Sequence, residues 1–160
     1  MVYYLIGVSG VGKSAVCKEL SEENSNIVYQ ELDEIYRRYK QREKNHDLAI
    51  EKTEERLKEV ENINDGNIYL IDVGSFAQKY LNINIWKERR LQLICLKNTI
   101  DFSYKNYVKR AANRMNLERW KKSELSHKRQ ELYSLSEYVI DCSGLDLLTV
   151  KEMVLKIITK

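Results

Sequence analysis

The sequence predicts an α/β fold in which helices flank a parallel β-sheet. Short apolar runs alternate with longer segments of helical periodicity along the 160 residues, and this alternation is the pattern of repeated βα units. Strands that are joined through helices run parallel to one another. A chain of this length fits one hydrophobic core, so we expect a single domain over residues 1–160.

The first half of the chain predicts two strands and at least three helices. Residues 2–6 form a buried strand, residues 13–22 a helix and residues 26–29 a weaker second strand. The next helix is predicted by apolar residues spaced i, i+3, i+4 and i+7, namely Leu32, Ile35, Tyr36 and Tyr39. Residues 40–61 are mostly polar and predict one or two weakly packed surface helices.

The second half predicts three more strands. After the turn signal Asp65-Gly66, strands are expected at residues 68–71, 91–96 and 138–140. Residues 99–116 and 123–136 are helical by composition, with a basic joint at residues 115–122. The break at Ser143-Gly144 precedes a last amphipathic helix.

Charge and cysteine content narrow the function classes. The net charge of +3, from 27 basic and 24 acidic residues, lacks the basic excess of a dedicated nucleic-acid binder, although residues 109–129 form a locally basic segment. The cysteines Cys17, Cys95 and Cys142 are far apart in the chain, which favours buried thiols in a reducing compartment. The apolar run at the N-terminus is too short for a membrane span or signal peptide, so we expect a cytoplasmic protein without membrane contact.

The residues after the first strand carry the most specific motif. Residues 7–14 read GVSGVGKS and match the GxxxxGKS phosphate-binding loop between a strand and a helix. Backbone N–H groups of such a loop point at phosphate oxygens, the lysine contacts the β- and γ-phosphates, and the serine hydroxyl binds Mg²⁺. The expected nucleotide contacts are Gly7, Ser9, Gly10, Val11, Gly12, Lys13, Ser14 and Ala15. The sequence therefore predicts a P-loop NTPase fold, three-layered, that binds ATP with Mg²⁺.

Asp72 directly follows the apolar run of the third predicted strand. This is the position of a carboxylate that holds Mg²⁺ directly or through water. The alternative is an aspartate that caps the next helix. Gly74, two residues later, would let the backbone pass close to a ligand.

Acidic residues open the helix after the second strand. Glu31, Asp33 and Glu34 are favoured there by the helix dipole whatever the function. If the phosphoryl acceptor is an alcohol, Asp33 is the candidate to orient or deprotonate it, because ligands gather at the carboxyl ends of parallel strands.

Arg110 and Arg114 are four residues apart and share one helix face. They are candidates for catalytic residues on a mobile lid at about residues 110–123, which would close over the transferring phosphoryl group. A solvated basic helix is the alternative interpretation.

With these residues placed, the sequence resembles the shikimate kinase family among the nucleoside monophosphate kinase-like P-loop folds. The resemblance rests on the P-loop and on a series of segments in the same order, namely residues 33–35, 68–74, 96–100, 128–133 and 138–143. It implies a five-stranded parallel sheet of order 2-3-1-4-5. It also implies that Lys13 and Ser14 bind phosphate and Mg²⁺, that Arg110 is the lid arginine and that Arg129 holds the acceptor's carboxylate.

The acceptor site departs from the family pattern. On an ungapped match the family's acceptor-binding aspartate falls on Leu32, one position from Asp33, and its second acceptor-binding arginine falls on Glu51. A glutamate repels a carboxylate acceptor, so we expect an ATP- and Mg²⁺-dependent kinase whose acceptor is a small molecule other than shikimate, with Asp33, Gly74 and Arg129 as its contacts.

Two alternatives remain beside the small-molecule kinase. One is a nucleoside, nucleotide or nucleic-acid-end kinase that uses the basic segment at residues 109–129 to hold phosphates. The other is a nucleotide-binding regulatory protein with weak ATPase activity, with Trp86 and Trp120 either on a partner surface or in the core. A monomer or weak homodimer is expected.

Overall fold

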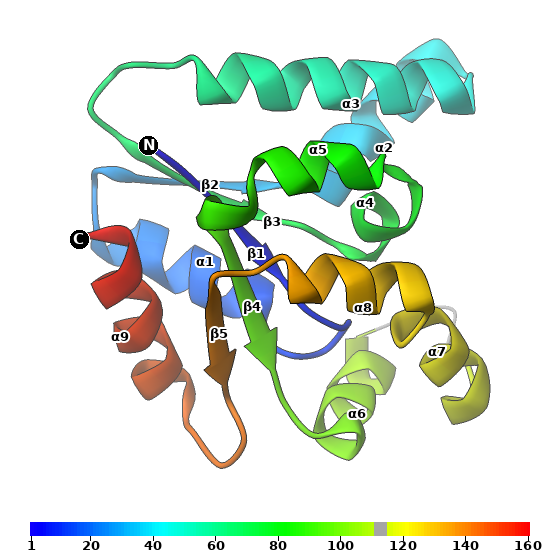
Figure 1. The fold of residues 1–160 in the computed structure, drawn as a ribbon, viewed down its shortest axis with the longest axis vertical. Coiled ribbons are helices and arrows are strands. Elements are labelled where there is room, and N and C mark those ends of the chain that lie inside the picture. The colour runs from blue at the N-terminus through cyan, green and yellow to red at the C-terminus, as the bar shows by residue number, and fades with distance from the viewer. Residues whose placement is uncertain (111–114) are drawn as a thin grey trace.

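The sheet has five parallel strands in the order β2-β3-β1-β4-β5 (Figure 1). We describe the fold from a computed structural model of the chain, in which residues 1–110 and 115–160 are described. The strands are β1 (Val2–Ile6), β2 (Ile27–Glu31), β3 (Ile68–Asp72), β4 (Leu93–Lys97) and β5 (Tyr138–Asp141). The predicted fold class and strand order are confirmed.

Helices cover both faces of this sheet. One face is covered by α1 (Lys13–Glu23) and α9 (Leu147–Ile158). The remaining helices are α2 (Leu32–Glu43), α3 (His46–Glu61), α4 (Ser75–Tyr80), α5 (Ile83–Glu88), α6 (Ile100–Arg110), α7 (Leu117–Glu124) and α8 (His127–Ser134), of which α3, α5 and α8 pack on the other face. In Figure 1, α6 and α7 lie beyond the carboxyl ends of β1 and β4, next to the loop that joins β1 to α1. This edge of the sheet is where ligands bind in open α/β folds.

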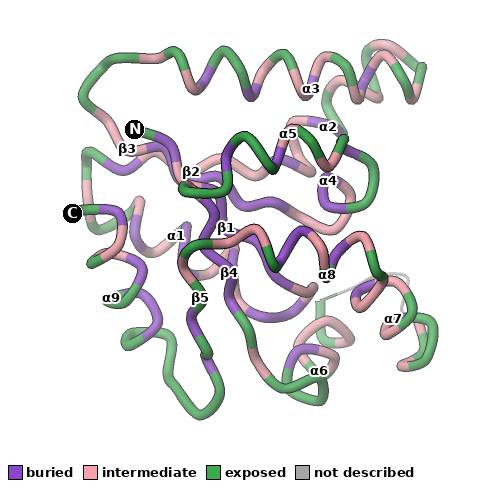
Figure 2. Tube along the Cα trace, viewed as in Figure 1, coloured by how far each residue is buried: buried purple, intermediate pink, exposed green. Residues whose placement is uncertain are grey.

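Alternation along each strand divides the core into two layers. In β4, Leu93 and Cys95 pack with α3, α5 and α8, whereas Ile94 and Leu96 pack with α1 and α9. Successive side chains of a strand point to opposite faces, so a strand buried on both faces has to be apolar at nearly every position. Figure 2 shows the resulting buried centre and the exposed outer surfaces of the helices.

The structure corrects several predicted boundaries. β2 runs to Glu31, so Glu31 ends a strand rather than opening α2. β4 begins at Leu93, after the 3-10 turn Arg90–Gln92. The basic joint contains the helix α7, and the short helices α4 and α5 were not predicted. Six residues give too little periodicity for a helix to be recognised from sequence.

Helix α3 packs more firmly than its polar sequence suggests. Ala49, Thr53, Leu57 and Val60 are all buried, and their spacing of three or four residues places them on one face. Fully buried Leu57 and Val60 join the core layer under β3. The prediction of weakly packed surface helices was therefore wrong for α3.

Both tryptophans belong to the interior. Trp86 of α5 and Trp120 of α7 are each 0% exposed. The ring of Trp86 meets Tyr4 edge-on at a centroid distance of 5.7 Å, and Trp120 packs near Tyr104 at 5.6 Å. The interpretation of these two residues as part of an exposed partner surface was wrong.

The three cysteines are buried and unpaired, as expected. Within the described part of the chain, no helix is both long and apolar enough to cross a membrane.

Trp86→Ala should lower the free energy of unfolding by about 3–5 kcal/mol, because it removes a fully buried ring and leaves a cavity beside Tyr4. Denaturant unfolding followed by circular dichroism measures this loss. The matched control is Leu148→Ala on α9, where the side chain is 55% exposed and the expected change is within about 0.5 kcal/mol. Equal losses for the two variants would contradict the assignment of Trp86 to the core.

Candidate functional site

The P-loop is held tightly between β1 and α6. Gly10 has a φ of 90°, and a Cβ built on it would lie 2.0 Å from the Ser103 carbonyl oxygen of α6. Any side chain at this position would meet backbone, which cannot move aside cheaply. Asn106 of α6 donates to the Gly10 carbonyl at 3.3 Å, so the loop is fixed to α6 as well as to the sheet.

Helix α1 begins with free backbone donors. Its N-cap is Gly12, which has no side chain to accept from them, and its first turn holds no acidic residue. By contrast, the helices α3, α5, α7 and α9 are capped by the side chains of Asn45, Asn82, Asn116 and Asp146. The open N–H groups and the helix dipole together make this end of α1 suited to an anion.

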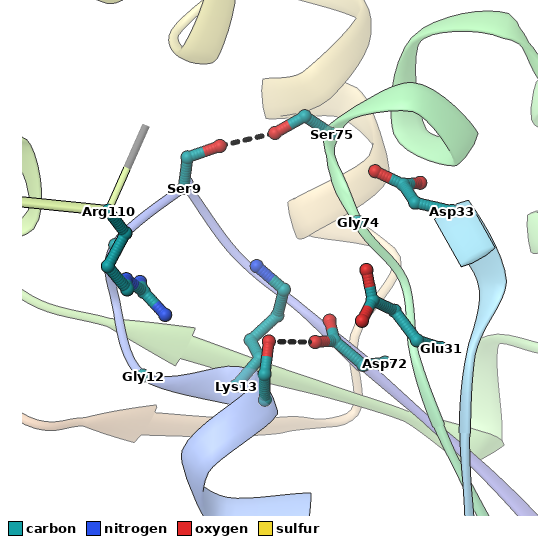
Figure 3. Close-up of a pocket in the computed structure, with 11 residues that line it drawn as sticks. Ser9, Gly12, Lys13, Glu31, Asp33, Asp72, Gly74, Ser75 and Arg110 are labelled. Atoms are coloured by element: carbon teal, nitrogen blue, oxygen red, sulfur yellow. Dashed lines mark hydrogen bonds between the residues drawn. The ribbon is translucent and has the colours of Figure 1, made fainter. Parts of the chain in front are cut away.

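Lys13 lies at the start of α1 and is buried among these groups. Its Nζ donates to the carbonyl oxygens of Gly7 at 3.0 Å and Val8 at 3.3 Å. An ammonium group has three donors, so one remains for a phosphate in the loop. Figure 3 shows the Lys13 side chain extended across the cleft between the loop and β3.

Ser14 and Asp72 fit a Mg²⁺ site. The Ser14 hydroxyl donates to Asp72 Oδ2 at 2.5 Å, and the second oxygen, Oδ1, is buried without a hydrogen-bond partner. A buried carboxylate oxygen left unpaired is costly, and a cation at this point would relieve that cost. Mg²⁺ is commonly held by one or two protein oxygens together with substrate phosphates and waters, which is the donor set available here.

Asp33 is fixed by the start of α4. Its carboxylate accepts from the backbone N–H groups of Phe76 at 3.2 Å and Ala77 at 3.1 Å. Gly74 makes this approach possible, because a Cβ there would lie 2.2 Å from the Asp33 carboxylate. The ungapped position Leu32 is instead fully buried in the core, so the acidic group that reaches the cleft belongs to Asp33.

Glu31 and Asp72 are register neighbours at the ends of β2 and β3. Burial, followed by the nearby Asp72 carboxylate, raises the pKa of Glu31 above its ordinary value, while Arg37 acts in the opposite direction. Burial also raises the pKa of Asp33, although its two backbone hydrogen bonds counteract part of the shift. The cleft therefore holds three carboxylates, and burial and mutual repulsion penalise the charge of Glu31 and Asp33.

A buried ion pair joins the P-loop to the start of α4. Glu124 of α7 accepts from the Ser9 backbone N–H at 2.8 Å and from the Ser9 hydroxyl at 3.1 Å. Arg129 of α8 donates to Glu124 and also to the Ser75 carbonyl oxygen at 3.0 Å. The side chains of Glu124 and Arg129 are each only 2% exposed. Figure 3 shows the Ser9 and Ser75 hydroxyls meeting across the cleft.

The residues predicted for a lid and for the acceptor site have different placements. Arg110, at the end of α6, lines the cleft on the P-loop side (Figure 3), whereas Arg114 lies outside the described residues. Arg129 is buried behind Ser75 and paired with Glu124. Glu51 is exposed on α3 and is not among the described residues that line the cleft.

A second, apolar hollow adjoins the phosphate cleft and shares Gly12 with it. Its walls come from the P-loop, the start of α6 and the loop between β5 and α9; they include Val11, Asn98, Phe102, Asn106, Leu145 and Leu147. Phe102 is 47% exposed and Leu145 39% exposed, which is unusual for apolar side chains gathered at one place unless a ligand covers them.

Sequence reasoning did not identify this hollow or the role of Glu124. Phe102 and Leu145 are 43 residues apart, and only the fold brings their segments together. Glu124 falls within the basic segment at residues 109–129 and was not singled out. An acidic residue five positions before Arg129 was the available signal, but nothing in that spacing indicates that both side chains are buried.

Several solved structures share this fold. Shikimate kinase from Bacteroides thetaiotaomicron matches with a TM-score of 0.69 and 16% identity, covering 100% of this chain and 99% of that chain. Shikimate kinase from Aquifex aeolicus matches with a TM-score of 0.68 and 20% identity, covering 99% and 96%. A tunicamycin resistance protein from Deinococcus radiodurans matches with a TM-score of 0.69 and 17% identity, covering 97% and 93%.

The sequence itself matches no family model and no curated protein. The structural likeness nevertheless establishes the fold, which is that of the shikimate kinases and related P-loop kinases.

Gly74→Ala should destabilise the protein by about 1–3 kcal/mol, because the new methyl group displaces the Asp33 carboxylate from the start of α4. In an Asp33→Ala background the same change should cost less, since the group that it collides with is gone. Denaturant unfolding of the wild type, both single variants and the double variant measures this coupling. Strictly additive effects would contradict the close packing of Gly74 on Asp33.

Proposed function

We propose that this chain, which has the shikimate kinase-like P-loop fold, transfers the γ-phosphoryl group of ATP to a hydroxyl group of a small molecule, with Mg²⁺. The observation that carries the proposal is the uncapped start of α1 with Lys13, facing an Asp72 carboxylate oxygen that is buried and unpaired. Donors for phosphate and a carboxylate oxygen that could hold a cation thus lie side by side. The solved structures of the same fold include named kinases, which supports phosphoryl transfer over simple nucleotide storage.

The two adjoining hollows suit the two parts of the nucleotide. The phosphates would lie against the P-loop N–H groups and Lys13, and the base would lie against Phe102 and Leu145 in the apolar hollow. Mg²⁺, held by Ser14 and Asp72, would neutralise charge on the phosphate oxygens. Arg110 enters the cleft from the P-loop side (Figure 3), where a guanidinium group could match phosphoryl oxygens.

Asp33 is the group that we assign to the acceptor hydroxyl. Its carboxylate lines the cleft, and its orientation is fixed by two backbone N–H groups of α4. A carboxylate has about four lone-pair sites, so capacity remains to accept a hydrogen bond from an alcohol. The raised pKa of Asp33 makes it a better proton acceptor than an exposed aspartate. Its main effect would be to orient the hydroxyl, because catalysis of phosphoryl transfer depends mostly on positioning and charge.

The basic segment gives less support to a nucleic-acid-end kinase than its sequence suggested. Arg129 is paired with Glu124, Lys121 with Glu118, and Lys128 donates to backbone carbonyls of Lys79 and Leu81. These three charges have partners within the protein, so they are less available to a phosphate backbone. The burial of Trp86 and Trp120 likewise removes the observation that favoured a regulatory partner protein.

Lys13→Ala should abolish measurable phosphoryl transfer and weaken Mg-ATP binding about 10- to 100-fold, because a charge-assisted hydrogen bond to phosphate contributes about 1.5–3 kcal/mol. Nucleotide affinity is measured by calorimetry, and the thermal shift with Mg-ADP gives an independent readout. The matched control is Lys18→Ala on the same helix, whose side chain is 67% exposed. Unchanged affinity in Lys13→Ala would overturn the P-loop assignment.

Asp72→Asn should weaken ADP binding about 10- to 100-fold in the presence of Mg²⁺ and leave metal-free ADP binding nearly unchanged, because the carboxylate acts on the cation. Calorimetric titrations with Mg²⁺ and with a chelator separate the two effects. Asp101→Asn, at an exposed position of α6, serves as the control. If the loss were equal with and without Mg²⁺, Asp72 would be a structural residue only.

A further inference from the structure

The charges of the cleft are distributed unevenly between its two sides. Lys13 and Arg110 belong to the P-loop side, whereas Glu31, Asp33, Gly74 and Ser75 line the opposite side (Figure 3). Among the described lining residues, that opposite side has two carboxylates and no basic side chain. If the P-loop side binds nucleotide, the acidic side is the surface that meets the acceptor.

Arg129, which the family resemblance assigns to an acceptor carboxylate, supplies no free charge to this surface. Its guanidinium group donates to Glu124 and to the Ser75 carbonyl oxygen, and its side chain is 2% exposed. A buried arginine that already has a carboxylate partner contributes little net field beyond the pair. An acceptor carboxylate would have to displace Glu124, which Ser9 and Ser75 also hold through three hydrogen bonds.

Asp33, in contrast, has no ion-pair partner among the described residues, although Lys13 on the P-loop side acts to lower its pKa. Its hydrogen bonds come from two neutral backbone N–H groups, and no ion pair joins it to a lysine or arginine within residues 1–110 and 115–160. Glu31 is paired with Arg37, which is largely exposed on α2. The acceptor side of the cleft therefore carries negative charge that the protein neutralises only in part.

We infer that the acceptor is a hydroxyl compound without a carboxylate or phosphate group, and that a protonated amine on it strengthens binding. This inference rests on the proposed function and specifies its substrate class. A like charge within about 4–6 Å of a partly buried carboxylate is disfavoured by tenfold or more, and an opposite charge is favoured to a similar extent. Uncharged polyols and amino alcohols therefore suit the site, whereas hydroxy acids and sugar phosphates do not.

Three probes that share one scaffold test this charge preference. Shikimate is an anion, its methyl ester is uncharged, and its amide with ethylenediamine carries a protonated amine at neutral pH. Their affinities for the wild-type protein are measured by calorimetry in the presence of Mg-ADP. We expect the amine to bind best and shikimate worst, with at least a tenfold difference between these two.

Two variants identify the group responsible. Asp33→Asn should reduce the preference for the amine over shikimate to less than about threefold, because it removes one negative charge with little change of shape. Glu55→Gln, at an exposed position of α3, should keep the full preference. Thermal shifts with Mg-ADP are recorded for every variant, so that a loss of folding is recognised.

The outcomes separate this inference from the proposed function. Tightest binding of shikimate, equal affinities of the three probes, or no binding of any probe at millimolar concentration while the Mg-ADP shift is intact would overturn the assignment of the acceptor class. A preference that survives in Asp33→Asn would overturn the role of Asp33. Absence of any Mg-ADP shift in the wild-type protein would instead overturn the proposed function itself.

Discussion

The ion pair between Glu124 and Arg129 is the interaction on which the geometry of the cleft depends. It connects the consecutive helices α7 and α8 to two segments that are remote in sequence, the P-loop through Ser9 and the start of α4 through Ser75. Replacing such a pair with apolar residues is often neutral for stability, but removing one partner strands a buried charge at a cost of about 3–5 kcal/mol. The pair therefore fixes position more than it adds stability, and it sets the width of the cleft between Ser9 and Ser75.

The same pair changes what the cleft can recognise. An arginine with an open guanidinium group binds carboxylates through two parallel hydrogen bonds. In this protein the carboxylate is supplied internally by Glu124, and it is held by backbone and hydroxyl donors as well as by Arg129. If this side of the cleft binds the acceptor, Arg129 therefore offers it no free charge. Asp33, which has no ion-pair partner among the described residues, would then contribute most to the charge on this side.

The fold could be predicted from sequence because its signals are local. Each signal spans only a few residues: the apolar runs of β1 and β3, and the GxxxxGKS motif between β1 and α1. The sheet order was predicted from the family resemblance that rests on these segments. At the site, local signals also identified four residues that line the same cleft, namely Lys13, Ser14, Asp72 and Gly74. What they do in catalysis remains a prediction.

The remaining features depend on pairings across the fold that leave no local trace. Glu51 was singled out because it aligns with the family's second acceptor-binding arginine. It is nevertheless exposed on α3 and is not among the described residues that line the cleft. Glu124 was not singled out, because a glutamate among basic residues is usually an ordinary solvated charge. Glu124 is buried because Trp120, one turn earlier on α7, packs against Tyr104 of α6 and holds this face of the helix against the protein.

Packing also limits how α7 can act in a closing motion. A rigid displacement of α7 would separate Trp120 from α6 and Glu124 from Arg129, so that a large apolar ring would be exposed and a buried charge left unpaired. The second loss alone costs about 3–5 kcal/mol, a large fraction of the total stability of a domain of this size, about 5–15 kcal/mol. Arg110 does not bear this cost, since it is an exposed side chain at the end of α6 that already lines the cleft. In the proposed function, closure over a phosphoryl group would therefore cost least as a movement of the Arg110 side chain at the end of α6, with α7 remaining as the fixed wall behind Ser9.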